Sequence, residues 1–282
     1  MGNSIFFCLS AFGIYLSQQK KHKPFSEWFK GRISRIYPSM WIVLLFLALP
    51  IMFILGQVND ESIMAFIGKF FNPPYWFIRA LLVYYLLSFF LLGDEQRTKL
   101  FSVFGLSGVL YFVVYFTCVD LSKWTVEDTS IKLIHYFMIF VFGFYLASKN
   151  KSIVYTGVHN YFIVIFLVAV VYGHKFLMTK GFYPEVQFIQ QVAMYPFLFY
   201  MLKISRSPLV SSLINKYKGV SIPINFIADH SLELYIIQVT FVYPLTKLNL
   251  SFPLNMVIFL ALTFISAAIV NRLAHIVRKR IP

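Results

Sequence analysis

KGRISRIYPSMWIVLLFLALPIMFILG, residues 30–56, joins a basic segment directly to a long apolar one. From residue 36 to residue 56 the chain carries no Asp, Glu, Lys or Arg. The hydrocarbon core of a bilayer requires about 20 mostly apolar residues for one crossing by a helix. This stretch therefore predicts a transmembrane helix with two arginines, Arg32 and Arg35, at its entrance.

The composition of the whole chain places it among membrane proteins. Of its 282 residues, 59% are hydrophobic, 20% are aromatic and only 13% are charged. Soluble domains have about 25% charged residues and about 45–50% apolar ones. Aromatic side chains can stack on nucleic-acid bases, but the long uncharged runs leave no exposed groove for them. We therefore expect an integral membrane protein with no nucleic-acid partner.

About nine stretches have the length and composition of membrane spans. They lie near residues 3–17, 36–56, 73–92, 100–119, 133–148, 159–177, 185–202, 229–246 and 252–271. Most connections between them are short, and the chain shows no internal repeats. The sequence thus predicts an all-α integral membrane protein, a polytopic helical bundle in which residues 1–282 form a single membrane-embedded domain.

The lysines and arginines predict the orientation of this bundle. Most of the 25 lie on alternate connections between the spans, together with the C-terminal segment. Cytoplasmic loops carry the excess of Lys and Arg, so we expect a cytoplasmic C-terminus. The net charge of +14 follows mainly from this bias and suits contact with anionic membrane lipids.

An odd number of spans would then place Met1 outside the cell. The first apolar segment has no basic residues before it and no cleavage site, so it is not a signal peptide. The simplest interpretation is that one further helix precedes this segment.

Arg32 and Arg35 are three residues apart and therefore lie on the same side of a helix. Guanidinium groups bind phosphate in a bidentate manner, which an ammonium group does less well. The pair predicts a site for a phosphate-rich cytosolic ligand. The alternative is an anchor that follows the positive-inside rule and contacts lipid headgroups.

NPPYWFIRALLVYY, residues 72–85, predicts the start of another span. Pro73 and Pro74 suit the first turn of a helix, and Trp76 suits the membrane interface. Arg79 would lie about 7 Å beyond Pro74 along the helix axis. It can either extend its side chain to the interface or line an internal cavity.

NFIADHSLELYIIQ, residues 225–238, is the densest group of polar residues within an apolar region. Asn225, Asp229 and Glu233 recur every four residues and would form one stripe on a helix. An intramembrane carboxylate usually faces a cavity or a partner. The alternative is a structural hydrogen bond between helices. The other polar residues of this stretch are His230, three residues before Glu233 and able to share a proton with it, and the hydroxyl residues Ser231 and Tyr235.

Other chemical motifs are absent from the sequence. No histidine pair has metal-ligand spacing with a carboxylate, so we expect no metal. We also find no glycine-rich phosphate loop and no nucleophile elbow.

Four stretches together resemble acyltransferase family 3, the ten-span bacterial membrane O-acyltransferases. IFFCLSAFGIYLS, residues 5–17, is similar to the family's second helix, and RISRIYPSMW, residues 32–41, to its Arg-x-x-Arg segment followed by Tyr-Pro-x-x-Trp. YWFIRALLVYYLL, residues 75–87, and HSLELYIIQ, residues 230–238, are similar to its Trp-Phe and Ser-x-Glu-x-Tyr helices. The four occur in the family's order from Ile5 to the C-terminus.

The resemblance implies transfer of an acyl group, usually acetyl, from cytoplasmic acyl-CoA at the bacterial inner membrane. The acceptor would be a hydroxyl of a surface polysaccharide, such as an O-antigen, or of its lipid-linked precursor. Arg32 and Arg35 would bind acyl-CoA, which is a substrate, so no bound cofactor is expected. The catalytic residues would be Glu233, Ser231, Tyr235 and His230. The residues lining the cavity would be Arg79, Asp229 and Trp76.

The sequence departs from the family pattern at three places. The family's first helix, which carries a basic residue and a histidine, is not found here, so we expect a chain that is truncated at its N-terminus. His230 could replace that histidine in part. Ala11 stands where the family usually has glycine, and Gln238 where histidine is common.

Three alternatives to an active O-acyltransferase remain open at this point. A polysaccharide transporter or flippase would often show paired inverted repeats, and we find none. A polysaccharide polymerase would be expected to have a large outer loop. An inactive, truncated member of the same family is the third alternative, because loss of a general base costs about 10²–10⁴-fold in rate.

Overall fold

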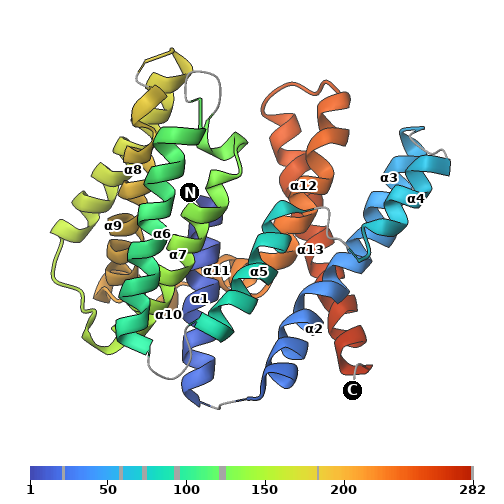
Figure 1. The fold of residues 1–282 in the computed structure, drawn as a ribbon. Coiled ribbons are helices and arrows are strands. Elements are labelled where there is room, and N and C mark those ends of the chain that lie inside the picture. The colour runs from blue at the N-terminus through green and yellow to red at the C-terminus, as the bar shows by residue number, and fades with distance from the viewer. Residues whose placement is uncertain are drawn as a thin grey trace. The chain divides into compact units, whose positions relative to one another are not determined.

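The computed structural model describes residues 1–20, 23–56, 60–71, 75–91, 96–120, 125–182 and 184–280 (Figure 1). The structure is 86% helical, and the described residues contain no strand. The prediction of an all-α protein is therefore confirmed.

A helix covers most of every predicted span. Five helices within the described residues are long and apolar enough to cross a membrane. They are Phe25–Ile54, Lys99–Cys118, Ile131–Ser148, His159–Thr179 and Leu254–Lys279. Trp76–Phe90 is a shorter apolar helix. The chain is thus a polytopic helical membrane protein.

The chain divides into two compact units, and the division falls within helix α5, Trp76–Leu91. Unit 1 comprises residues 1–23 and 80–216, and unit 2 comprises residues 24–79 and 217–282. That residues 1–282 act as a single domain stays a prediction.

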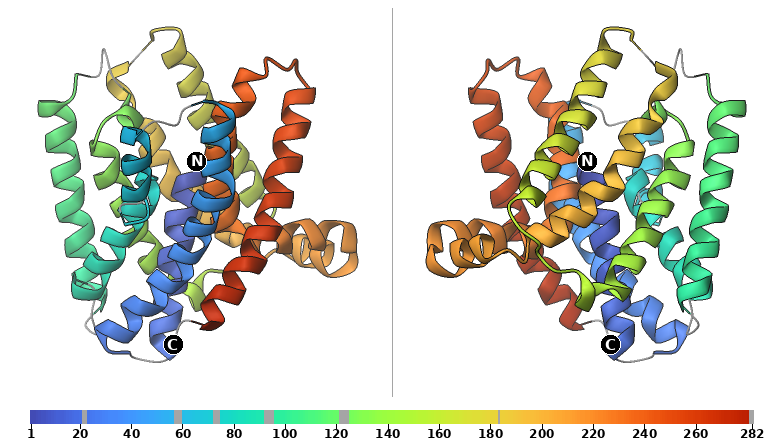
Figure 2. Two further views of the ribbon diagram at one scale, coloured as in Figure 1. Left: turned by 90° about the vertical axis from the view of Figure 1, so that its right-hand side faces the viewer. Right: turned by 90° about the vertical axis from the view of Figure 1, so that its left-hand side faces the viewer.

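Unit 1 contains the remainder of α5, five further long helices and a short one. These six are α1 Gly2–Lys20, α6 Gln96–Cys118, α7 Ile131–Ser148, α8 His159–Thr179, α9 Phe188–Ile204 and α10 Pro208–Lys216. Three short 3₁₀ turns connect them: η2 Val126–Asp128, η3 Asn150–Ser152 and η4 Pro184–Val186. Helices α8 and α9 pack side by side, as the views of Figure 2 show.

Helix α7 forms the core of unit 1. It is apolar around most of its circumference, and such a helix is stable only when other elements surround it. Ile139, Phe140 and Phe144 are all fully buried. Helix α8, by contrast, exposes Phe162, Ile165 and Phe166, as expected for a surface in contact with lipid.

Helices α1 and α7 approach each other closely at Gly143. A Cβ atom at this position would overlap the carbonyl oxygen of Cys8 and lie 2.9 Å from the Cβ of Ala11. Small residues at helix interfaces allow such contact between backbones in membrane proteins. Ala11, itself a small residue, thus lies opposite a glycine on the partner helix.

We predict that Gly143→Ala lowers the stability of the protein. In a helix, Ala is normally more stable than Gly by about 0.5–1 kcal/mol. At Gly143, overpacking against a backbone carbonyl should reverse the sign and cost about 1–3 kcal/mol. Thermal unfolding of the detergent-purified protein measures this change.

Gly13→Ala is the matched control for this variant. Gly13 lies in α1, the other helix of this pair, and a Cβ atom there meets nothing within 4 Å. The control should retain or slightly raise the unfolding temperature. An unfolding temperature of Gly143→Ala equal to that of the control would contradict the close approach.

Unit 2 contains α2 Phe25–Val43, α3 Leu49–Ile54, α4 Asp60–Gly68, the start of α5, α11 Lys218–Asp229, α12 Ser231–Lys247 and α13 Leu254–Arg280. The π-helical turn η1, Leu44–Ala48, joins α2 to α3 and makes Phe25–Ile54 one continuous helix. Pro50 explains this turn, because proline lacks the N–H that would bond to the carbonyl four residues earlier. Helices α2, α12 and α13 pack against one another.

Candidate functional site

The residues predicted for the functional site all belong to unit 2. They lie on α2 (Arg32 and Arg35), at the start of α5 (Trp76 and Arg79), at the end of α11 (Asp229), at the joint between α11 and α12 (His230), and on α12 (Ser231, Glu233 and Tyr235).

Glu233 is buried, with 3% of its surface exposed. The hydroxyl of Ser39 on α2 donates a hydrogen bond of 2.6 Å to its Oε1 atom. The Nη2 atom of Arg278 on α13 lies 3.3 Å from the same oxygen and forms an ion pair with it. A buried charge is tolerated when it is both paired and hydrogen-bonded, and Glu233 meets both conditions.

Arg278 also links the other members of this group. Its Nη2 atom donates to the Ser39 hydroxyl at 2.7 Å and to the main-chain carbonyl of Arg35 at 2.8 Å. One guanidinium group therefore contacts α2 at two points and α12 at one. We call Ser39, Glu233 and Arg278 the polar triad of unit 2.

Arg32 and Arg35 lie on the first half of α2, on the helix rather than in a preceding loop. The guanidinium carbon of Arg32 lies over the ring of Trp28, 5.5 Å from its centroid. The residue Arg35 is exposed, and its side chain makes no hydrogen bond or ion pair within the described parts of the chain. The helical spacing predicted for the pair is confirmed, and the Arg35 guanidinium remains available to a ligand.

The predicted polar stripe through Asn225, Asp229 and Glu233 is not continuous. Helix α11 ends at Asp229 and α12 begins at Ser231, so the two elements are separated at His230. Asn225 and Asp229 are exposed, whereas Glu233 is buried. The prediction of one stripe on one helix was therefore wrong.

The interruption falls at His230, whose backbone angles (φ −112°, ψ 14°) depart from those of a helix. Its Nδ1–H donates to the carbonyl oxygen of Phe226 at 2.8 Å, and its ring stacks on the Phe226 ring with centroids 4.1 Å apart. The side chain is thus directed to α11, whereas the hydrogen bonds of Glu233 go to Ser39 and Arg278. The catalytic role of His230 stays a prediction.

The start of α5 is fixed against α12 by aromatic side chains. Tyr75 and Thr240 share a hydrogen bond of 3.1 Å, and the ring of Phe77 lies 4.3 Å from that of Tyr235. Trp76 is half-buried and Arg79 is exposed. Pro73 and Pro74, predicted to begin this helix, lie outside the described residues.

The catalytic roles of Ser231 and Tyr235 and the expected absence of a metal stay predictions. Ser231 is exposed and Tyr235 is half-buried, which tests neither for a role in chemistry. Among the described residues, no three His, Cys, Asp or Glu side chains are grouped to hold a metal ion. The structure therefore supplies no candidate metal site in those ranges.

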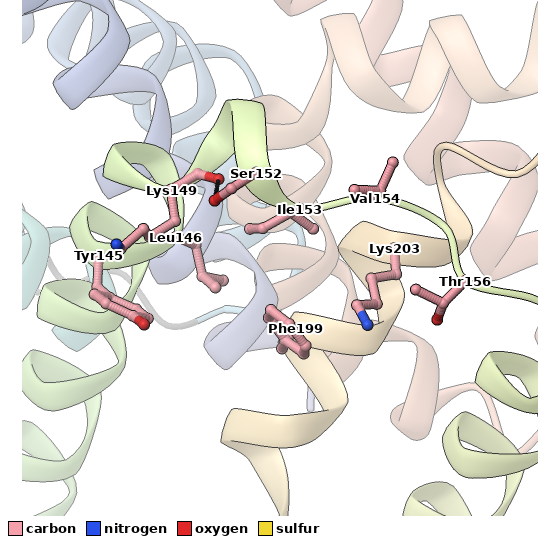
Figure 3. Close-up of a pocket in the computed structure, with 9 residues that line it drawn as sticks. All are labelled: Tyr145, Leu146, Lys149, Ser152, Ile153, Val154, Thr156, Phe199 and Lys203. Carbon is pink, nitrogen blue, oxygen red and sulfur yellow. Dashed lines mark hydrogen bonds between the residues drawn. The ribbon is translucent and has the colours of Figure 1, made fainter.

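A separate pocket of about 280 Å³ lies in unit 1, between the ends of α7 and α9 (Figure 3). None of the predicted site residues lines it. Arg206 donates to the carbonyls of Asn150 and of Ile153, and Ile153 is one of the lining residues. Lys149 and Lys203 both line the pocket, but Figure 3 shows their side chains pointing in different directions. The lysines do not converge on a single point.

Ser39 and Arg278 were not identified from the sequence. Ser39 lies four residues after Arg35, so helical spacing places it on the same side of α2. Arg278 was counted only among the basic residues of the C-terminal segment. It lies four residues after Ala274, which is fully buried on α13, and that spacing could have indicated an inward direction.

A family model described as an acyltransferase domain matches residues 1–272. The chain belongs to acyltransferase family 3. Searches of curated proteins and of solved structures found no match. Membership of this family makes acyl transfer the general activity of the domain. Arg278 lies beyond the residues that match the family.

We predict that Ser39→Ala lowers stability by on the order of 1–2 kcal/mol, because Glu233 would lose a hydrogen bond to its carboxylate. The unfolding temperature of the purified protein measures the effect. Ser34→Ala is the matched control, since Ser34 lies on the same helix and donates only to the carbonyl of Gly31. Equal unfolding temperatures for the two variants would show that the bond to Glu233 contributes nothing.

Proposed function

We propose that this protein transfers an acyl group, an acetyl group in the simplest case, from acyl-CoA to a hydroxyl of a surface polysaccharide or of its lipid-linked precursor. One observation carries the proposal beyond the family assignment. Arg278 donates to the main-chain carbonyl of Arg35 and also pairs with the buried carboxylate of Glu233. The turn of α2 that carries Arg32 and Arg35 therefore lies near that carboxylate.

The two arginines suit the phosphates of the acyl donor. Coenzyme A carries a diphosphate and a further phosphate, and each can accept two parallel hydrogen bonds from the planar fork of a guanidinium group. Arg32 is held by Trp28, which restricts its side chain before a ligand arrives. A pre-organised cation loses less conformational entropy on binding than a free one.

The carboxylate of Glu233 suits the acceptor side of the reaction. The hydrogen bonds of its Oε1 atom go to Ser39 and Arg278. We find no hydrogen bond to Oε2 in the described part of the chain, so this oxygen can accept one from a substrate hydroxyl. In the transfer, the acyl carbon–sulfur bond breaks and an acyl carbon–oxygen bond forms, while the hydroxyl proton passes to the thiolate of coenzyme A.

The remaining features of the proposal concern position in the cell. The excess of Lys and Arg on alternate connections supports an inner-membrane protein whose Arg32–Arg35 segment faces the cytoplasm. Acyl-CoA is a cytosolic compound, so the arginines would meet it directly. The neighbouring Ser231, Tyr235, Asp229, Trp76 and Arg79 are proposed to line the path of the acceptor.

We predict that the double variant Arg32→Lys, Arg35→Lys raises KM for acyl-CoA by about tenfold or more. Lysine retains the positive charge but cannot form the bidentate contacts of a guanidinium group. Release of free coenzyme A by membranes that contain the protein and its acceptor measures the reaction. Mass spectrometry of the glycan from deletion and complemented strains identifies the product.

Arg272→Lys provides the matched control. Arg272 is exposed on α13 and makes no hydrogen bond or ion pair with the other described residues, so this change should leave KM unaltered. If the double variant has the same KM as the control, the two arginines bind no phosphate of the donor.

A further inference from the structure

We propose that Arg278, which lies beyond the residues matched by the family, is a positioning residue that holds Glu233 in place for acyl transfer. The proposal rests on the function proposed above for the same site. Its evidence is the geometry of the polar triad in unit 2.

Helix α13 directs Arg278 into this position. Ala267, Val270 and Ala274 are buried along one side of the helix, and Arg278 continues that side by one more turn. The small side chain of Ala274 allows α13 to approach the other helices. The guanidinium group of Arg278 consequently reaches α2 and α12 instead of extending to water.

The contacts of Arg278 give Glu233 an ion-pair partner and, together with Ser39, hold one of its carboxylate oxygens in place. Its Nη2 atom lies 3.3 Å from Oε1 of Glu233 and 2.7 Å from the hydroxyl of Ser39, which itself donates to Oε1. The third contact, to the carbonyl of Arg35, keeps the guanidinium close to α2. Both contacts converge on Oε1, so they restrict rotation of the carboxylate, while Oε2 accepts no hydrogen bond from the described residues.

Arg278 differs in this respect from its neighbour Lys279. Lys279 is exposed and makes no hydrogen bond or ion pair within the described ranges, as expected for a basic residue that serves only membrane orientation. Removal of Arg278 leaves an uncompensated buried carboxylate, whereas neutralising Arg278 and Glu233 together leaves none. The two basic residues should therefore behave differently when they are replaced.

The first test measures how readily the carboxyl group of Glu233 is labelled by a carbodiimide in the full chain, and it does not depend on activity. Arg278→Met, Glu233→Gln, the double variant and Lys279→Gln are purified in detergent and treated with a hydrophobic carbodiimide, which labels protonated carboxyl groups in apolar surroundings. Mass spectrometry measures labelling at Glu233.

We expect low labelling in the parent and in Lys279→Gln, and strong labelling in Arg278→Met. The double variant should regain part of the thermal stability that Arg278→Met loses. Equal labelling in Arg278→Met and Lys279→Gln would overturn the proposal.

The second test separates positioning from binding of the donor. A residue that acts through Glu233 should lower kcat by on the order of tenfold or more and leave KM for acyl-CoA within about twofold of the parent. Arg278→Lys should restore part of kcat, because it returns the charge but not all three contacts. A rise in KM at unchanged kcat would make Arg278 a residue that binds the donor and would overturn the positioning role.

The two tests distinguish failure of this inference from failure of the proposed function. If the parent protein transfers no acyl group from acyl-CoA, the proposed function is wrong, and the labelling result still decides whether Arg278 controls Glu233. If the parent is active and labelling does not respond to Arg278→Met, the function stands and the positioning role is wrong.

Discussion

Burial of one negative charge governs the architecture of unit 2. A carboxylate within a membrane protein needs a cation and further hydrogen-bond donors, because lipid and apolar side chains supply neither. Glu233 obtains these from Arg278 on α13 and from Ser39 on α2. The three helices that carry these residues are also the ones that pack together in this unit. Their arrangement and the charge therefore depend on each other.

In unit 1, helices α1 and α7 associate through close contact of their backbones. Gly143 lets α7 approach the backbone of α1 at Cys8 and Ala11, so contact between main chains replaces contact between polar groups. Small residues and interhelical hydrogen bonds are the two general means of joining helices in lipid, where apolar surface alone gives little preference for protein over lipid. Both units use both means: α8 and α9 of unit 1 are also joined by a hydrogen bond between His174 and Gln190, and α13 of unit 2 buries Ala267 and Ala274. Both means require close approach of the helices, which explains why Ala274 and Ala267 line α13.

The sequence predicted the helices well because each depends on a local property. A run of about 20 apolar residues must satisfy its own backbone hydrogen bonds, and a helix does so. The features that were missed depend on contacts between distant segments. The inward direction of Arg278 follows from packing of α13 against α2, and the role of Ser39 follows from its bond to Glu233, 194 positions away. The joint at His230 is different, because it is a break in backbone geometry at one residue, which an apolar pattern does not record. Charge counting treated Arg278 like Lys279, since counting carries no information about which side of a helix is buried.

The division of tasks among the arginines of unit 2 follows from their surroundings. The three contacts of Arg278, to Glu233, Ser39 and a main-chain carbonyl, all go through its Nη2 atom, and its buried Nε has no hydrogen-bond partner among the described residues. Arg35 offers its carbonyl to Arg278 and keeps its own side chain exposed. The main-chain carbonyl of Arg35 thus connects α2, which carries Arg32 and Arg35, to the ion pair of Arg278 and Glu233. Because α2 already begins at Phe25, these cations stand on a rigid helix whose position is set by the triad. Movement of Glu233 would therefore be transmitted to the arginines proposed to receive the acyl donor.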